Sequence, residues 1–136
     1  LVVADINRRR HGVSNRVHLH QCDLLEALQA PVDVIVSNPP YICSSELPSL
    51  EPEVSLYEPR EALDGGDDGM TVIRCLIPQS AARLGPGGTL IMELDPRQGR
   101  QAQEIARAAF PTAVIRLSRD LSGQERVLVV QKGLGH

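Results

Sequence analysis

Four consecutive residues, Asn38-Pro39-Pro40-Tyr41, combine groups that can hold a flat molecule with an amino group. Two prolines in a row fix the backbone φ angle and remove two N–H donors, so the peptide carbonyls of the loop stay free. Asn38 adds a side-chain carbonyl and Tyr41 adds an aromatic face that can pack against a planar group. The tetrapeptide predicts a site for a neutral NH2 group. We expect all four residues to bind substrate, with Asn38, Pro39 and Tyr41 as its catalytic residues.

The same four residues also fit a purely structural role. A Pro-Pro turn closed by an asparagine cap and a packing tyrosine needs the same side chains. The position favours the functional alternative, because the tetrapeptide directly follows the apolar residues 32–37. In open α/β sheets, ligands bind beyond the carboxyl ends of the strands.

The elements that must position this loop alternate along the chain. Short aliphatic runs bounded by turn residues predict strands at residues 1–5, 16–20, 32–37, 89–94, 113–117 and 126–131. Helical spacing predicts helices at residues 70–84 and 97–110, and residues 118–125 are typical of a hairpin loop. The alternation predicts a doubly wound α/β sheet with an antiparallel last strand. Residues 42–68 show little periodicity, and a loop of that length is usually functional.

Length and composition exclude several classes of protein. A chain of 136 residues is at most one domain, and its 23% charged residues are normal for a globular protein. No apolar run approaches the roughly 18–20 residues that a membrane-spanning helix needs. A net charge of −3 and a scarcity of aromatic residues argue against a surface that stacks bases. We therefore expect no membrane association and no direct binding of nucleic acid.

Metal binding is not indicated either. Residues 64–69 carry carboxylates beside glycines, but they lack the alternate ligand spacing and the closing glutamate of a calcium loop. His18 and His20 alternate along a predicted strand, with no third ligand near them in the sequence.

Further segments extend the pattern around the tetrapeptide. Residues 57–70 read YEPREALDGGDDGM, residues 87–93 read GGTLIME and are followed by Gln98, and residues 119–126 read RDLSGQER. Together with VSNPPYI at residues 36–42, these segments resemble the HemK/PrmC family of S-adenosylmethionine-dependent methyltransferases. That family methylates the glutamine amide nitrogen in the Gly-Gly-Gln motif of class-1 peptide-chain release factors. The resemblance implies a Rossmann-like methyltransferase sheet.

The resemblance also implies where the cofactor, S-adenosyl-L-methionine, is bound. Asp5, at the end of a predicted strand, would accept hydrogen bonds from the ribose hydroxyls, and Asp23 would lie near the adenine. Asn38 would contact both cofactor and substrate. Structural alternatives stay open, because Asp5 could cap a turn and Asp23 could cap a following helix.

The implied reaction is direct methyl transfer to an amide nitrogen. The Asn38 side-chain oxygen and the Pro39 carbonyl would accept the two N–H bonds, and Tyr41 would hold the glutamine in line. Placement of the reacting atoms then replaces any protein nucleophile or charged base.

The chain departs from the family pattern on its amino-terminal side. The family's first strand, its glycine-rich cofactor loop and its amino-terminal recognition domain have no counterpart among residues 1–136. We therefore expect residues 1–136 to be a partial methyltransferase catalytic domain, truncated on that side. The expected partner is a class-1 release factor and the expected state is a monomer. The expected location is the mitochondrial matrix in a eukaryote, or otherwise the bacterial cytoplasm.

Two other functions stay open on the sequence. A DNA or RNA amino-methyltransferase would share the NPPY tetrapeptide, although the acidic balance and the few aromatics oppose it. An inactive fragment that serves as a binding module is favoured by the missing glycine-rich loop.

Overall fold

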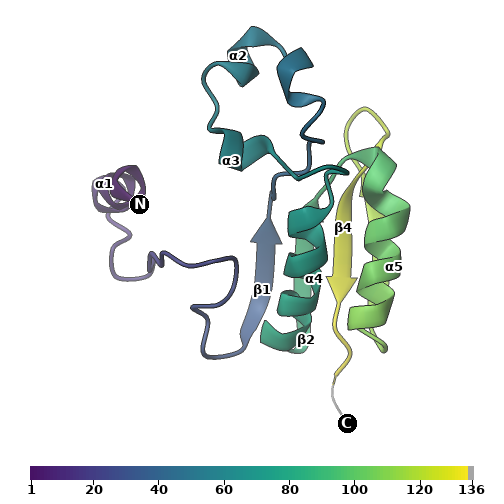
Figure 1. Cartoon of the computed structure of the whole chain (residues 1–136). Helices are drawn as coiled ribbons and strands as arrows, with labels where there is room; N and C mark the ends of the chain where they lie inside the picture. The colour runs from purple at the N-terminus through teal and green to yellow at the C-terminus, as the bar shows by residue number, and fades with distance from the viewer. Residues whose placement is uncertain (135–136) are drawn as a thin grey trace.

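A mixed four-stranded sheet forms the centre of the molecule (Figure 1). The computed structural model describes residues 1–134. The strands lie in the order β1 (Val32–Ser37), β2 (Leu84–Glu93), β4 (Glu125–Gln131) and β3 (Val114–Arg119). β1 and β2 are parallel, whereas β4 is antiparallel to both β2 and β3. The predicted α/β class with an antiparallel last strand is confirmed.

Two helices cover one face of this sheet (Figure 1). They are α4 (Thr71–Arg83) and α5 (Gly99–Ala109), and the short helix η2 (Pro96–Gln98) precedes α5. Both predicted helices are confirmed, with slightly shorter bounds. Side chains alternate along each strand, so every second residue points at the helices. The core between the layers includes Ile35, Ile73, Ile77, Leu90, Met92, Ala102, Ala106, Leu128 and Val130.

The opposite face of the sheet is open along β1. Val34 and Val36 are 55% and 74% exposed, whereas Ile35 between them is buried. The apolar run of β1 predicts a strand covered on both faces. In residues 1–134 helices cover only one of them.

Two predicted strands are wrong. Residues 1–5 lie within or directly before helix α1 (Val2–Arg10), and residues 16–20 contain no strand. A strand needs a neighbour to pair its backbone groups, whereas a helix pairs its own. No segment of residues 1–134 pairs with residues 1–5, while Arg8 and Arg9 bind the Asp5 carboxylate within the helix. Local interactions therefore decide the conformation of this segment.

The loop of residues 42–68 contains only short helices. These are η1 (Leu47–Ser49), α2 (Pro52–Ser55) and α3 (Arg60–Leu63). They lie beyond the carboxyl end of β1, above the sheet in Figure 1. Because Ser37 is in register with Met92 in the parallel pair, β1 and β2 end at the same edge. This edge positions the candidate site.

Candidate active site

The predicted tetrapeptide leaves the sheet at this edge. Pro39 is buried, Pro40 and Tyr41 are half-buried, and Asn38 is exposed. A pocket of about 90 Å³ lies beside the loop, lined by Asn38, Pro39, Tyr41, Ile42, Ala62 and Leu63. Pro40 is not among the lining residues. A pocket of this volume has room for a group the size of a side-chain amide.

Residues 63–65 are hydrogen-bonded to the chain directly after Tyr41. The Ile42 N–H donates to the Leu63 carbonyl at 3.0 Å, and the Gly65 N–H donates to the Ile42 carbonyl at 2.8 Å. This short parallel pairing ties the two ends of the 42–68 loop together and brings Leu63 to the pocket. The long loop is therefore pinned at its base.

The Asp64 carboxylate holds the base of the same loop. Its Oδ1 accepts from Ser44 Oγ at 2.6 Å and from the Gly66 N–H at 2.9 Å, and its Oδ2 accepts from Arg60 Nε at 3.0 Å. These hydrogen bonds, the one from Ser44 foremost, lower the pKa of Asp64 below its ordinary value. Asp64 is thus an ionised carboxylate that fixes the loop.

Gln98 joins three parts of the site and is only 7% exposed. Its Nε2 donates to the carbonyls of Tyr41 at 2.8 Å and Gly69 at 3.1 Å, and its Oε1 accepts from the Asp95 N–H at 3.1 Å. Gly69 has a φ of +71°, and a Cβ there would collide with the Tyr41 carbonyl and with Gln98. Only glycine fits this turn.

The Tyr41 side chain is held by Glu93, the last residue of β2. The Tyr41 hydroxyl donates to Glu93 Oε1 at 3.0 Å. Burial, followed by the Glu93 carboxylate, raises the pKa of Tyr41, so the phenol is neutral and keeps its proton. Sequence reasoning gave neither Glu93 nor Gln98 a role. The sequence feature that could have indicated a role is that both residues belong to one of the segments that resemble the methyltransferase family.

Arg97 connects the 42–68 loop to the turn after β2. Its guanidinium donates to Glu46 Oε1 at 2.7 Å and to Glu46 Oε2 at 3.0 Å, and its Nε donates to Asp95 Oδ1 at 2.9 Å. Hydrogen bonds from Arg97 lower the pKa of both carboxyls. A bidentate pair of this kind sets orientation as well as charge.

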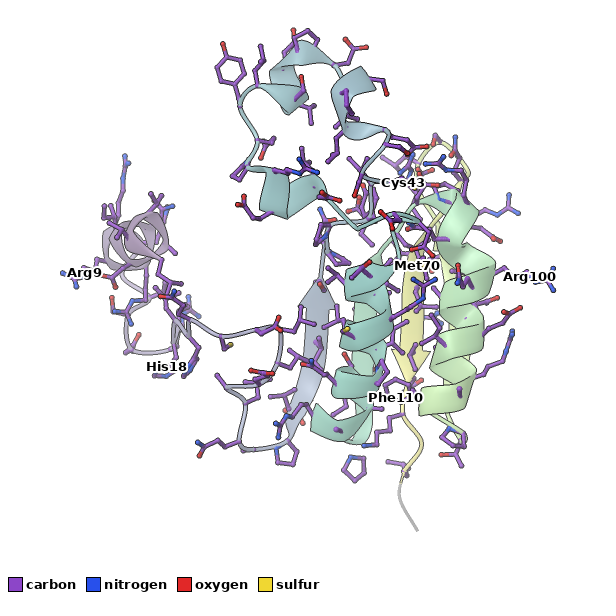
Figure 2. All side chains as sticks on the ribbon, viewed as in Figure 1. Arg9, His18, Cys43, Met70, Arg100 and Phe110 are labelled. Carbon is purple, nitrogen blue, oxygen red and sulfur yellow. The ribbon has the colours of Figure 1, made fainter. Side chains whose placement is uncertain are left out.

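Asp5 and Asp23, the two predicted cofactor contacts outside the tetrapeptide, do not lie beside the NPPY loop. Asp5 lies on α1, where its carboxylate binds Arg8 Nη2 and Arg9 Nη2, each at 2.7 Å. Hydrogen bonding to Arg8 is the main reason that the pKa of Asp5 is lowered. Asp23 is exposed and begins a turn rather than a helix, with its carbonyl accepting from the Glu26 N–H at 3.1 Å. Figures 1 and 2 show α1, marked by Arg9, standing apart from the sheet.

Residues 1–134 contain no group of three or more His, Cys, Asp or Glu side chains arranged to hold a metal ion. Among the helices of the same residues, none has the length and apolar character needed to cross a membrane.

The sequence is similar to those of several release factor glutamine methyltransferases. It is 42% identical to the one from Gloeobacter violaceus over 130 residues, which is 95% of this chain and 46% of that protein. It is 44% identical to the one from Bradyrhizobium diazoefficiens over 121 residues, 89% of this chain and 41% of that protein. The chain thus spans about half the length of the curated relatives it matches. No family model matches it.

Two solved structures share the fold. A methyltransferase from Pyrococcus furiosus superposes with a TM-score of 0.60 at 19% identity, covering 96% of this chain and 56% of that one. An O-methyltransferase family protein from Burkholderia thailandensis gives a TM-score of 0.59 at 16% identity, with 98% and 41% covered. The four-stranded sheet therefore fits a truncated Rossmann-like methyltransferase fold.

Proposed function

We propose that this chain, a homologue of the release factor glutamine methyltransferases over about half of their length, supplies the acceptor-binding part of an amide methyltransferase. The proposed acceptor is the side-chain nitrogen of the glutamine in the Gly-Gly-Gln motif of a class-1 release factor. One observation carries the proposal. Asn38, Pro39 and Tyr41 together line a pocket the size of an amide at the carboxyl end of β1.

The neutral oxygen atoms that Asn38 and Pro39 carry suit an amide nitrogen. Such a nitrogen is a poor nucleophile, because its lone pair is delocalised into the carbonyl. The Asn38 side-chain oxygen and the Pro39 carbonyl accept its two N–H bonds and favour the positive charge that develops on it. Placing the reacting atoms in line lowers the activation free energy by on the order of 7–11 kcal/mol at best.

S-adenosylmethionine, when bound, supplies the methyl group as a sulfonium. The acceptor side fits the residues present, since Asn38 and Pro39 line the same pocket. The proposed ribose contact of Asp5 fits less well, because Arg8 and Arg9 already occupy its carboxylate on α1. A cofactor role for Asp5 and Asp23 requires residues 1–31 to approach the end of β1.

The paired state of Asp5 favours a second candidate, a binding module without catalysis. In that case the pocket would hold an amide side chain of a partner protein and transfer nothing to it. Binding of S-adenosylmethionine distinguishes the two candidates.

The test uses a fusion that places the amino-terminal half of the Gloeobacter violaceus relative upstream of Leu1. We expect the fusion to transfer labelled methyl groups from S-adenosylmethionine to a release factor domain that contains Gly-Gly-Gln. The change Asn38→Ala removes one acceptor and should lower the rate by about a hundredfold or more. Asn15→Ala, in an exposed turn, is the matched control and should leave the rate unchanged.

Calorimetric titration of the 136-residue chain and of the fusion with S-adenosylmethionine accompanies the assay. If the fusion binds cofactor but the Asn38→Ala rate equals the parent rate, the acceptor site is wrong. Methylation of an adenine-containing oligonucleotide in place of the protein would support the nucleic-acid alternative. Failure of the fusion to bind S-adenosylmethionine would contradict the methyltransferase proposal and support the binding module.

A further inference from the structure

Tyr41 is held at both ends, by the last residue of β2 and by a residue of η2, the short helix that follows β2. Its hydroxyl donates to Glu93 Oε1 at 3.0 Å, and its backbone carbonyl accepts from Gln98 Nε2 at 2.8 Å. We infer that Glu93 and Gln98 are positioning residues, which fix the Tyr41 ring and residues 38–40 relative to the acceptor pocket. This inference rests on the proposed function and names the groups that align its acceptor.

The surroundings of Glu93 favour a specific role over simple packing. Among residues 1–134 Glu93 forms no ion pair, and its only side-chain hydrogen bond is the one from Tyr41. The nearby Arg126 instead pairs with Asp120, at 2.9 Å. A half-buried carboxylate that makes no ion pair is less favourable than a neutral side chain of similar size. What the charge adds is a stronger hydrogen bond to the phenol.

The two contacts arise from the central strand β2 and from the turn that follows it. β2 pairs with β1 on one side and with β4 on the other. The turn after it is closed by a reciprocal capping box between Asp95 and Gln98. A residue tied at its hydroxyl and at its carbonyl can neither rotate nor shift freely. These contacts hold Tyr41 in a fixed position relative to the central strand β2. Asn38 and Pro39, which directly precede it in the loop, are held with it.

Titration of the phenol tests the Glu93 contact in the 136-residue chain alone. The sequence contains two tyrosines, and Tyr57 is 82% exposed, so Tyr57→Phe leaves Tyr41 as the sole phenol. In that background Glu93→Gln should lower the pKa of Tyr41, measured from phenolate absorbance, because the carboxylate no longer opposes the phenolate charge. Asp95 and Arg126 also act on this phenol, in opposite directions, and both stay in place.

Glu104→Gln, on the exposed side of α5, is the matched control and should leave the titration unchanged. An equal titration in the Glu93→Gln chain would overturn the role of Glu93. This measurement needs no cofactor and is independent of the proposed function.

The second test uses the fusion described above. Glu93→Gln and Gln98→Ala should each lower kcat by between about tenfold and about a hundredfold, with KM for S-adenosylmethionine unchanged. Gln101→Ala, exposed on α5, should not change kcat. Because Glu93 acts through the Tyr41 hydroxyl, Glu93→Gln should not lower kcat any further in a Tyr41→Phe background.

Additive losses in that double variant, or a rise in KM without a loss in kcat, would contradict the inference. An inactive parent fusion would instead refute the proposed function and the catalytic part of this inference with it. The titration would then still decide the contact itself.

Discussion

Two carboxylates close to the candidate site bind partners within the chain. Asp64 accepts from Ser44, and Asp95 accepts from Arg97. The groups proposed to meet the acceptor amide, the side-chain oxygen of Asn38 and the carbonyl of Pro39, are neutral. Methylation of an amide requires acceptors of this kind and no charged base, so the distribution of partners agrees with the proposed chemistry.

The contribution of one such internally bound carboxylate, Asp68, can be tested through the pH dependence of stability. Its carboxylate binds Arg74 and the Met70 N–H, and the Arg74 hydrogen bond foremost lowers its pKa from 3.8 to about 2. A pKa depressed on folding stabilises the native state above about pH 4, and the effect is lost as the pH falls toward 2. Asp68→Asn should therefore flatten the fall of unfolding free energy across this range, measured by urea denaturation at each pH. Asp67→Asn, at an exposed neighbour, should keep the parent profile.

At the level of elements, the site is a junction between the end of β1, the end of β2 and the turn that precedes α4. Three hydrogen bonds of the Gln98 amide link the second and third of these to Tyr41. The junction depends on close backbone approach, which is why Gly69 lies in it.

Replacement of Gly69 by alanine should be far more costly than the same change at a free turn. Gly69 has a φ of +71°, and an added Cβ would collide with the Tyr41 carbonyl and with Gln98. We expect Gly69→Ala to lower the unfolding free energy by about 2 kcal/mol or more. Gly123 has a φ of +84° with open space around it, so Gly123→Ala should cost only about 1 kcal/mol. Equal losses in urea unfolding would show that the junction tolerates the side chain.

For the whole molecule, stability is concentrated in the layer of α4 and α5 on the sheet. The apolar core lies there, whereas no residue of α1 is buried. Isolated helices shorter than about 12–15 residues are marginal in water, so α1 depends on its own ion pairs. The first ten residues therefore contribute little to the fold.

Removal of residues 1–10 should change the unfolding free energy by less than about 0.5 kcal/mol. In the intact chain, the amides of α1 should exchange with solvent far faster than those of Leu90 and Val130, which are fully buried in the sheet. Urea unfolding of both chains and amide exchange of the longer one check this. A large loss of stability on truncation, or slow exchange in α1, would mean that α1 packs on the core.

The sequence alone determined the class of fold, the order of most elements and the NPPY loop at a strand end. Those features follow from local patterns: apolar runs of strand length, helical spacing and the stiffness of two prolines. It failed for residues 1–5 and 16–20, because a strand exists only when another segment pairs with it. It also could not show that Glu93 and Gln98 hold Tyr41. Those contacts join residues 52 and 57 positions apart, and only the parallel register of β1 and β2 brings them together.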